Sequence, residues 1–337
     1  MNVLALDIGG ANLKLAHSAG FAASWPFPLW QRCLELANAL TEILASAPPA
    51  DRLAVTMTGE LADCFETKID GVNAILDAVE QAAGSRQVLV YLCDGRLVRV
   101  PEARTEPLLA AASNWHVLAT FAARYCTGGR GMLVDLGSTT CDIIPIEYGQ
   151  AHALGRTDPE RLASRELVYT GVERSPICAL VREISWRGEP CQVAQEVFAT
   201  TADAYVMLGD LPEDEEDIRT ADGRPRTQPF AHARLARTIC ADTTMFVAAD
   251  AMRAAAVIRD AQLHVLHKAV ESVIRNMESV PQTIVISGQG EFLLRQLFEK
   301  LNPLLPRRSL AEQLGPNISC SACAYALAVL AHERAAS

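Results

Sequence analysis

Short apolar runs alternate along the chain with segments whose apolar residues recur every three or four positions. Short apolar runs bounded by turns are typical of buried strands, and the longer spacing is typical of amphipathic helices. In the first part of the chain we predict a strand–turn–strand–strand unit at 2–26, strands at 53–57 and 88–92, and helices at 30–46 and 72–83. This alternation indicates an α/β fold.

The rest of the chain begins with a similar unit and then becomes largely helical. An Ala-rich helix predicted at 106–125 lies between two halves, and we place the domains at 1–112 and 113–337. Two segments depart from the pattern, an insertion near 156–190 and an exposed acidic loop near 209–229. The other predicted elements are strands at 132–135, 141–146, 151–154 and 282–287, and helices at 192–207, within 230–279, behind the 282–287 strand and at 321–334.

The same strand-to-turn sequence occurs twice, far apart in the chain. In the first copy an apolar strand reaches Asp7 and turns at Gly9 and Gly10, and in the second a strand reaches Asp135 and turns at Gly137. Glycine turns let backbone N–H groups approach an anion without a side chain in the way. Because open sheets present ligands at strand ends, the repeat predicts two related half-domains that share a phosphate-binding cleft.

The side chains around both turns suit phosphate chemistry. Asp7 and Asp135 are candidate Mg²⁺ ligands, because a carboxylate beside a phosphate is well placed to hold that ion directly or through water. Lys14 supplies a positive charge if it faces the cleft. The other candidates for phosphate or nucleotide binding are neutral residues, Asn12, Ser138, Thr139 and Thr140 near the turns, and Ser287, Gly288 and Gly290 in a later strand–Ser-Gly-X-Gly–helix segment.

Simpler structures also fit these segments. Each Asp-X-Gly stretch is compatible with an ordinary β-hairpin, and residues 284–292 are compatible with a plain strand-to-helix connection. A dinucleotide-binding fold is disfavoured because no G-x-G-x-x-G turn opens a helix here and residues 13–17 alternate like a strand. The Gly-Lys-Ser/Thr pattern of a Walker loop is absent.

Composition narrows the class of protein further. Half of the 337 residues are hydrophobic, and the formal net charge of −10 argues against a nucleic-acid surface built on bulk charge. No apolar run approaches the length of a membrane span. Ten scattered cysteines include one CxxC pair, Cys320 and Cys323, without the second pair of a zinc site, so we interpret this pair as part of a helix start. We expect reduced thiols and a cytoplasmic protein, for which a homodimer is a compatible assembly.

The order of these motifs resembles the actin-like ATPase superfamily. The resemblance rests on Asp-Ile-Gly-Gly-Ala-Asn, then Asp-Leu-Gly-Ser-Thr-Thr, then Ile-Ser-Gly-X-Gly, and it implies two ribonuclease-H-like domains with mixed sheets flanked by helices and a ligand cleft between them. More specific segments resemble the hydantoinase/oxoprolinase-related proteins of tetrahydromethanopterin-linked one-carbon metabolism, and within them the methanofuran-biosynthesis branch. These segments are 56–63, 169–176, 200–205, and 234–237 with 240–242.

The narrower resemblance implies a transferase. In that reaction the phenol oxygen of a small acceptor similar to γ-glutamyltyramine attacks a furanylmethyl diphosphate, which forms an ether and releases pyrophosphate. The implied catalytic set is Asp142, Glu60 and Asp7, with Asp142 or Glu60 as the base for the phenol proton. Lys14 and Arg174 are the cations for the diphosphate, and Mg²⁺ is the expected metal.

Two kinds of alternative stay open. For Arg174 a salt bridge to Glu173 or Glu166 competes with a phosphate contact, and for Asp203 and Tyr205 we favour a helix surface and a core position over a role in the site. The phosphate loops also suit ATP, so the rival functions are an ATP-dependent kinase or hydantoinase-type hydrolase and a non-catalytic nucleotide-switched scaffold. A nucleic acid or a membrane is not an expected partner.

Overall fold

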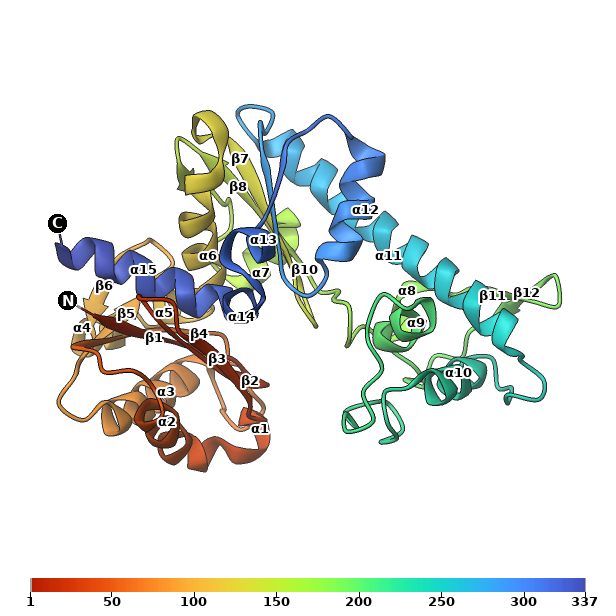
Figure 1. The fold of residues 1–337 in the computed structure, drawn as a ribbon, viewed down its shortest axis with the longest axis horizontal. Helices are drawn as coiled ribbons and strands as arrows, with labels where there is room; N and C mark the ends of the chain where they lie inside the picture. Colours follow the sequence, from red (N-terminus) through yellow and green to blue (C-terminus); the bar gives the residue numbers. More distant parts are fainter. Residues whose placement is uncertain (1, 337) are drawn as a thin grey trace.

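The structure, a computed structural model, describes residues 2–336 and contains two six-stranded mixed sheets and a separate two-stranded hairpin (Figure 1). The first sheet has the order β3-β2-β1-β4-β5-β6, in which β1 pairs antiparallel with β2 and parallel with β4. All six residues of β1 are buried, as expected for a central strand. The strands are β1 (Val3–Ile8), β2 (Asn12–His17), β3 (Ala22–Pro26), β4 (Arg52–Met57), β5 (Gln87–Tyr91) and β6 (Leu97–Arg99).

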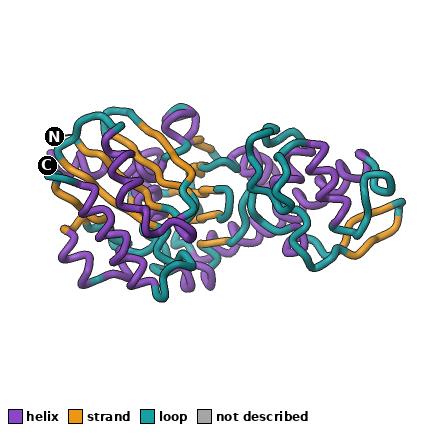
Figure 2. The backbone as a smooth tube through the Cα atoms, turned by 90° about the horizontal axis from the view of Figure 1, so that it is seen from below, coloured by secondary structure: helices purple, strands orange, loops and turns teal. Residues whose placement is uncertain are grey.

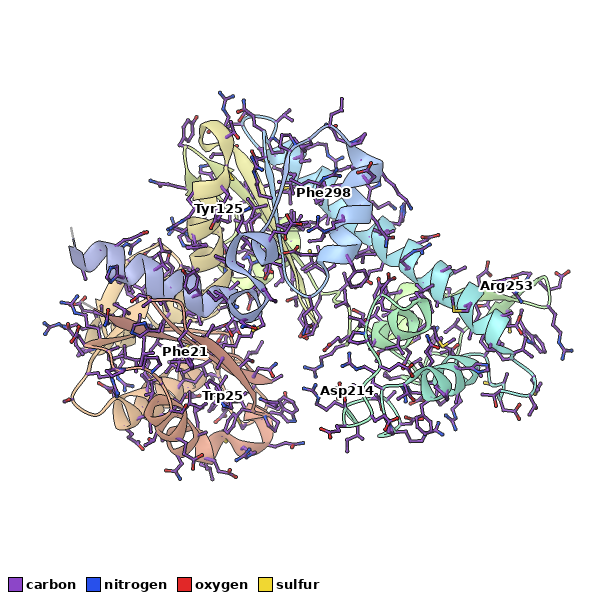
Figure 3. All side chains as sticks on the ribbon, in the orientation of Figure 1. Phe21, Trp25, Tyr125, Asp214, Arg253 and Phe298 are labelled. Carbon is purple, nitrogen blue, oxygen red and sulfur yellow. The ribbon has the colours of Figure 1, made fainter. Side chains whose placement is uncertain are left out.

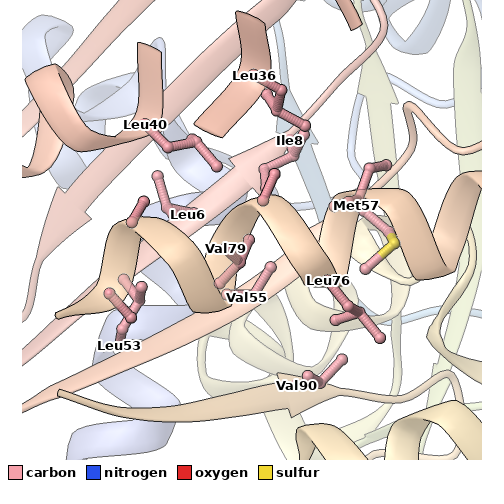
Figure 4. Close-up of a cluster of buried hydrophobic side chains, with 14 of the residues drawn as sticks. Leu6, Ile8, Leu36, Leu40, Leu53, Val55, Met57, Leu76, Val79 and Val90 are labelled. Atoms are coloured by element: carbon pink, nitrogen blue, oxygen red, sulfur yellow. The ribbon is translucent and has the colours of Figure 1, made fainter. Parts of the chain in front are cut away.

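Two amphipathic helices cover one face of the first sheet. Leu6 and Ile8 of β1 pack in one cluster with Leu40 of α2 and Val79 of α3 (Figure 4). Thr67 begins α3 with a capping box to Asp70, which explains why the helix starts there. The helices of this lobe are α1 (Leu29–Arg32), α2 (Leu36–Ala45), α3 (Lys68–Ala83), α4 (Val100–Thr105) and α5 (Pro107–Ala110).

The second sheet repeats the pairing of the first. Its order is β10-β8-β7-β13-β14, with β9 on β8, and β7 pairs antiparallel with β8 and parallel with β13. Its strands are β7 (Gly131–Leu136), β8 (Cys141–Glu147), β9 (Gln150–Ala151), β10 (Leu167–Val168), β13 (Ile284–Ser287) and β14 (Arg307–Ser309). The helices around it are α7 (Asp158–Ser164), α11 (Ala248–Asn276), α12 (Glu291–Leu301) and α13 (Leu310–Leu314), and the short helix α14 (Pro316–Ser319) contacts β3 of the first sheet.

Two helices lie between the sheets and join their cores. Side chains of α6 (Asn114–Ala122) and α15 (Ala322–Ala336) form one buried cluster with Val3 and Ala54 of the first sheet and with Leu133, Ile144 and Val285 of the second. The carboxyl-terminal helix α15 also packs along β1 and β2. The two sheets are therefore held together by a shared apolar layer.

A small subdomain extends the molecule at one end (Figure 2). It consists of α8 (Ile177–Leu180), the hairpin β11 (Glu183–Trp186) and β12 (Glu189–Gln192), α9 (Thr201–Leu208), α10 (Gln228–Arg237) and the first part of α11. At about 1.5 Å per residue the 29 residues of α11 reach about 43 Å, so that its later turns pack on the second sheet. Figure 3 labels Arg253 near the subdomain end of α11 and Phe298 beside the second sheet.

Three predicted helices differ from the structure. The one expected at 30–46 is divided into α1, a 3-10 helix at Cys33–Glu35 and α2. The helix expected at 192–207 begins only at Thr201, because Glu189–Gln192 pairs with β11 across a turn in which Arg187 and Gly188 have positive φ. The Ala-rich helix at 106–125 is broken at Ala112, whose φ is +46°, and forms α5 and α6 instead. The predicted domain limits, including the insertion near 156–190, stay predictions.

Candidate functional site

Each of the two predicted phosphate loops connects an antiparallel strand pair. Gly9 donates its N–H to the Asn12 carbonyl at 3.0 Å, and Gly137 donates to the Thr140 carbonyl at 2.9 Å. Both loops are therefore β-hairpin turns in local geometry. Each hairpin nevertheless belongs to a mixed sheet with a parallel neighbour, β4 or β13. Both turns thus lie at the strand ends where such sheets bind ligands.

The strand registers show that the two halves of the site are equivalent in position and different in charge. Asp7 of β1 lies opposite Lys14 of β2, whereas Asp135 of β7 lies opposite Asp142 of β8. The first half therefore pairs a carboxylate with a cation, and the second pairs two carboxylates. In each half the parallel neighbour places a hydroxyl residue beside the aspartate, Thr56 or Ser287.

Lys14 connects the two halves electrostatically. Its Nζ lies 4.0 Å from Asp7 Oδ2, and the charges of Asp7 and Asp135 raise the pKa of Lys14 although burial acts to lower it. Burial raises the pKa of Asp7, and Lys14 opposes that shift. Burial and then the Asp142 carboxylate raise the pKa of Asp135 to about 6, against a hydrogen bond from Ser287. The charge of Lys14 therefore acts on the aspartates of both loops.

Three of the five predicted backbone donors are free, and two are used inside the turns. The N–H groups of Gly9 and Gly137 are used inside the turns, which corrects the expectation that they bind phosphate. Within residues 2–336 the N–H groups of Gly10, Ser138 and Thr139 have no protein acceptor. Each turn therefore presents unpaired backbone donors, as an anion site requires.

The third predicted loop supports the second one. Gly288 has a φ of +91°, and a Cβ on it would lie 2.3 Å from the Leu136 carbonyl oxygen. A Cβ on Gly290 would lie 2.4 Å from the Leu136 side chain. Ser287 is buried and bonds to Asp135. Packing against β7 therefore accounts for the two glycines, and a binding role for Ser287, Gly288 and Gly290 stays a prediction.

A chain of ion pairs joins the two predicted base residues. Lys68 Nζ lies 3.6 Å from Glu60 Oε1 and 2.9 Å from Asp158 Oδ2, which links α3 of the first lobe to α7 beside the second sheet. Arg161, only 2% exposed, pairs with Asp158 at 3.5 Å and with Asp142. Burial raises the pKa of both Glu60 and Asp142, against Lys68 and Arg161 respectively. Glu60 Oε2 has no hydrogen-bond partner within the described chain.

Segment 169–176 lies directly on the second phosphate loop. Val172 N–H donates to the Gly137 carbonyl, and the N–H groups of Glu173 and Arg174 donate to the Ser138 carbonyl, all at 3.0 Å. A Cβ on Gly171 would lie 2.3 Å from the Ser138 carbonyl carbon, so only glycine allows this approach. The segment therefore fixes the backbone of Arg174 beside the loop.

Arg174 does not form the predicted salt bridges. Glu173 pairs with Arg226 at 3.6 Å, and Glu166 accepts two backbone N–H groups. The Arg174 side chain is exposed and lies over the Trp30 ring, 6.0 Å from its centroid. Its charge is therefore available to a ligand.

Asp203 and Tyr205 are structural residues. The expected surface position of Asp203 is wrong, because this side chain is buried, caps α9 and pairs with Arg234 at 2.7 Å. Tyr205 is buried, as predicted, and donates to Gln262, which in turn donates to the Gly171 carbonyl at 2.8 Å. These contacts support the segment that carries Arg174.

Comparison with known proteins shows the family of the chain. A family model described as hydantoinase/oxoprolinase matches residues 51–334. The (4-{4-[2-(gamma-L-glutamylamino)ethyl]phenoxymethyl}furan-2-yl)methanamine synthase of Methanocaldococcus jannaschii is 33% identical over 331 residues, which are 97% of either chain. The chain belongs to the hydantoinase/oxoprolinase family.

Other relatives fit this family assignment. The synthase of the same name from Methanococcus vannielii is 29% identical over 59% of this chain and 89% of its own. A solved structure of nucleotide-free acetone carboxylase has a TM-score of 0.52 and 10% identity, and covers 97% of this chain and 70% of its own. The predicted fold class, an actin-like arrangement of two mixed sheets flanked by helices, is confirmed.

Several residues near the candidate site could not be predicted from the sequence of this chain. Lys68 and Arg161 lie on helices without a local motif, so only the fold brings them to the candidate bases. The CxxC pair was interpreted only as a helix start, and α15 does begin at Ala322. Burial, followed by the charges of Asp7 and Asp135, raises the pKa of the Cys323 thiol.

The donor set fits a magnesium ion that keeps most of its water. Asp7 Oδ1 is buried without a hydrogen-bond partner among the described residues, and the charges of Asp7 and Asp135 both act on Lys14. Residues 2–336 contain no cluster of three or more His, Cys, Asp or Glu side chains suited to a metal. One or two carboxylates together with substrate phosphates are a usual magnesium environment.

Within residues 2–336 no helix has the length and hydrophobicity needed to cross a membrane.

Proposed function

We propose that this chain is a transferase of methanofuran-type cofactor biosynthesis that joins a furanylmethyl diphosphate to the phenol of a γ-glutamyltyramine-like acceptor. The observation that carries the proposal is the 33% identity to the Methanocaldococcus jannaschii synthase over nearly the whole of both chains. The name of that relative describes an ether between a phenol oxygen and a furan-bound methylene. The substrates are therefore two small molecules.

The reaction exchanges one C–O bond for another. The bond from the furan methylene to the diphosphate breaks, and its electron pair leaves with pyrophosphate. The phenol oxygen forms the new bond to the methylene, and its proton passes to a base. The protein must therefore stabilise a departing polyanion, hold the phenol beside the methylene and exclude water.

The loops supply the groups that a diphosphate needs. Unpaired N–H groups come from Gly10, Ser138 and Thr139, and the positive charges come from Lys14 and Arg174. A bidentate guanidinium contact suits a terminal phosphate. Asn12 and Thr140 complete the proposed binding set at the ends of the two turns.

Asp7 and Asp135 would hold Mg²⁺ in this proposal. The ion would neutralise charge on the leaving diphosphate. The unpartnered Oδ1 of Asp7 and the position of Asp135 support that role. The pKa of about 6 for Asp135 keeps most of this carboxylate ionised at neutral pH, as a metal ligand requires.

Of the two predicted bases we favour Glu60. Its Oε2 has no partner within residues 2–336, whereas Asp142 is paired with the buried Arg161. Burial also raises the pKa of Glu60. A base with a raised pKa accepts a proton more readily from the phenol, whose pKa is about 10.

The test measures pyrophosphate release from the purified protein with Mg²⁺, the furanylmethyl diphosphate and a tyramine-type phenol, and in parallel ATP turnover. We expect pyrophosphate that depends on the phenol. Asp7→Asn is expected to abolish it with little change in the unfolding temperature. ADP formation without pyrophosphate would contradict the proposal and favour the kinase or hydrolase alternative, and no turnover of either kind would favour the scaffold.

A further inference from the structure

An exposed tryptophan lies near Arg174, which is held beside the second phosphate loop. Trp30 lies on α1, at the edge of the first lobe turned toward the small subdomain (Figure 1), and its side chain is 38% exposed. The Arg174 guanidinium carbon is 6.0 Å from the centre of its ring. This distance is at the outer limit of a cation–π contact, so the contact is weak and both side chains can bind a ligand instead.

Both side chains project from backbone that is fixed to the phosphate loops. The Leu29 N–H donates to the Gly10 carbonyl at 2.9 Å. A Cβ on Gly59 would lie 2.6 Å from Leu29 Cδ2, which shows how closely the start of α1 packs here. On the other side, the Arg174 N–H donates to the Ser138 carbonyl. One loop therefore positions the indole, and the other positions the guanidinium.

From this geometry we propose that Trp30 binds the furan ring of the diphosphate donor while Arg174 binds its diphosphate, an inference that rests on the proposed function. A single methylene joins the ring of this substrate to its diphosphate, so the groups that bind them must be neighbours. Trp30 and Arg174 meet this condition, and they come from opposite halves of the site.

The indole ring also suits the chemistry at the methylene. As the bond to the diphosphate breaks, positive charge develops on the methylene and the furan ring. The face of an indole carries negative potential and attracts such a charge. Trp30 therefore stabilises the developing cation, and Arg174 stabilises the departing anion beside it.

The test compares two probes, furanylmethyl diphosphate and inorganic pyrophosphate, each by calorimetric titration with Mg²⁺. We expect Trp30→Ala to weaken the furanylmethyl diphosphate about tenfold and to leave pyrophosphate within about twofold. Trp30→Phe recovers most of the loss, because it keeps an aromatic face. Arg174→Ala weakens both probes. Trp186→Phe is the matched control, since Trp186 stacks under Arg187 on the distant hairpin, 4.5 Å from its ring centre.

The outcomes separate this inference from the function on which it rests. Equal weakening of both probes by Trp30→Ala would overturn the ring site and make Trp30 a support for Arg174. A rise in KM for the phenol alone would also overturn it. If the wild type releases no pyrophosphate with the phenol, the proposed function fails. A Trp30-dependent preference for furanylmethyl diphosphate over pyrophosphate would still support the ring site in that case.

Discussion

Replacing Asp135 by asparagine is expected to stabilise the protein and to remove its activity. Asp135 ends β7 beside the Asp142 carboxylate, and burial followed by that neighbour raises its pKa from 3.8 to about 6. The folded state therefore keeps a proton between about pH 4 and pH 6 that the unfolded state has lost. Stability falls as pH rises through this window, and the cost is complete above pH 6.

The size of the effect follows from the shift. About two pKa units at about 1.36 kcal/mol each correspond to about 3 kcal/mol. Solvent reaches part of the carboxylate, so screening reduces the expected gain from Asp135→Asn at pH 8 to about 2 kcal/mol. For 337 residues the unfolding entropy is about 0.7 kcal/mol per kelvin, which makes the rise in Tm about 3 °C.

Scanning calorimetry of the wild type and Asp135→Asn between pH 4 and pH 8, with EDTA present, measures this difference. The rise in Tm should be largest at pH 8 and should shrink toward pH 4. Asp260→Asn on α11, where the side chain is 57% exposed, is the control and should change little. A lower Tm for Asp135→Asn at pH 8, or a rise that is the same at every pH, would refute the reasoning.

Two further predictions concern the contacts that build the site. Gly171→Ala should destabilise the protein by about 1–3 kcal/mol in urea unfolding, because its Cβ would lie 2.3 Å from Ser138. Gly10→Ala is the control and should change stability little, since a Cβ there meets nothing within 4 Å. Equal effects of the two substitutions would contradict this packing argument. Arg161→Met should cost about 3 kcal/mol by leaving Asp142 without its cation, and adding Asp142→Asn should restore part of that loss. A double variant no more stable than the single one would contradict the pairing.

The fold could be predicted from the sequence wherever local pattern and tertiary structure agree. Both Asp–Gly turns lie after buried strands, and their registers match across the two sheets. The hydrophobic pattern did not predict the helix boundaries where single residues interrupt a helix. The positive φ of Ala112 breaks a predicted helix, and the turn at Arg187 and Gly188 replaces the start of another. Neither interruption has a strong signal in the hydrophobic spacing.

The site could be predicted only as far as its motifs extend. Asp7, Asp135 and Lys14 come from one repeated pattern, and the strand registers bring them together. The ion pairs of Lys68 with Asp158 and of Arg161 with Asp142 depend on how α3 and α7 pack, which no local sequence specifies. The placement of Asp203 failed for the same reason, because its partner Arg234 lies on a different helix.

The charge difference between the equivalent halves explains why the site has a direction. At the position where the first half carries Lys14, the second carries Asp142, which forms an ion pair with Arg161. The cations beside the two loops are then Lys14, which also pairs with Asp7, and Arg174. A symmetric anion gains nothing from this difference, whereas a diphosphate with an organic group at one end does. The structural repeat thus provides two equivalent phosphate loops, and the unequal side chains upon them determine which end of the substrate lies where.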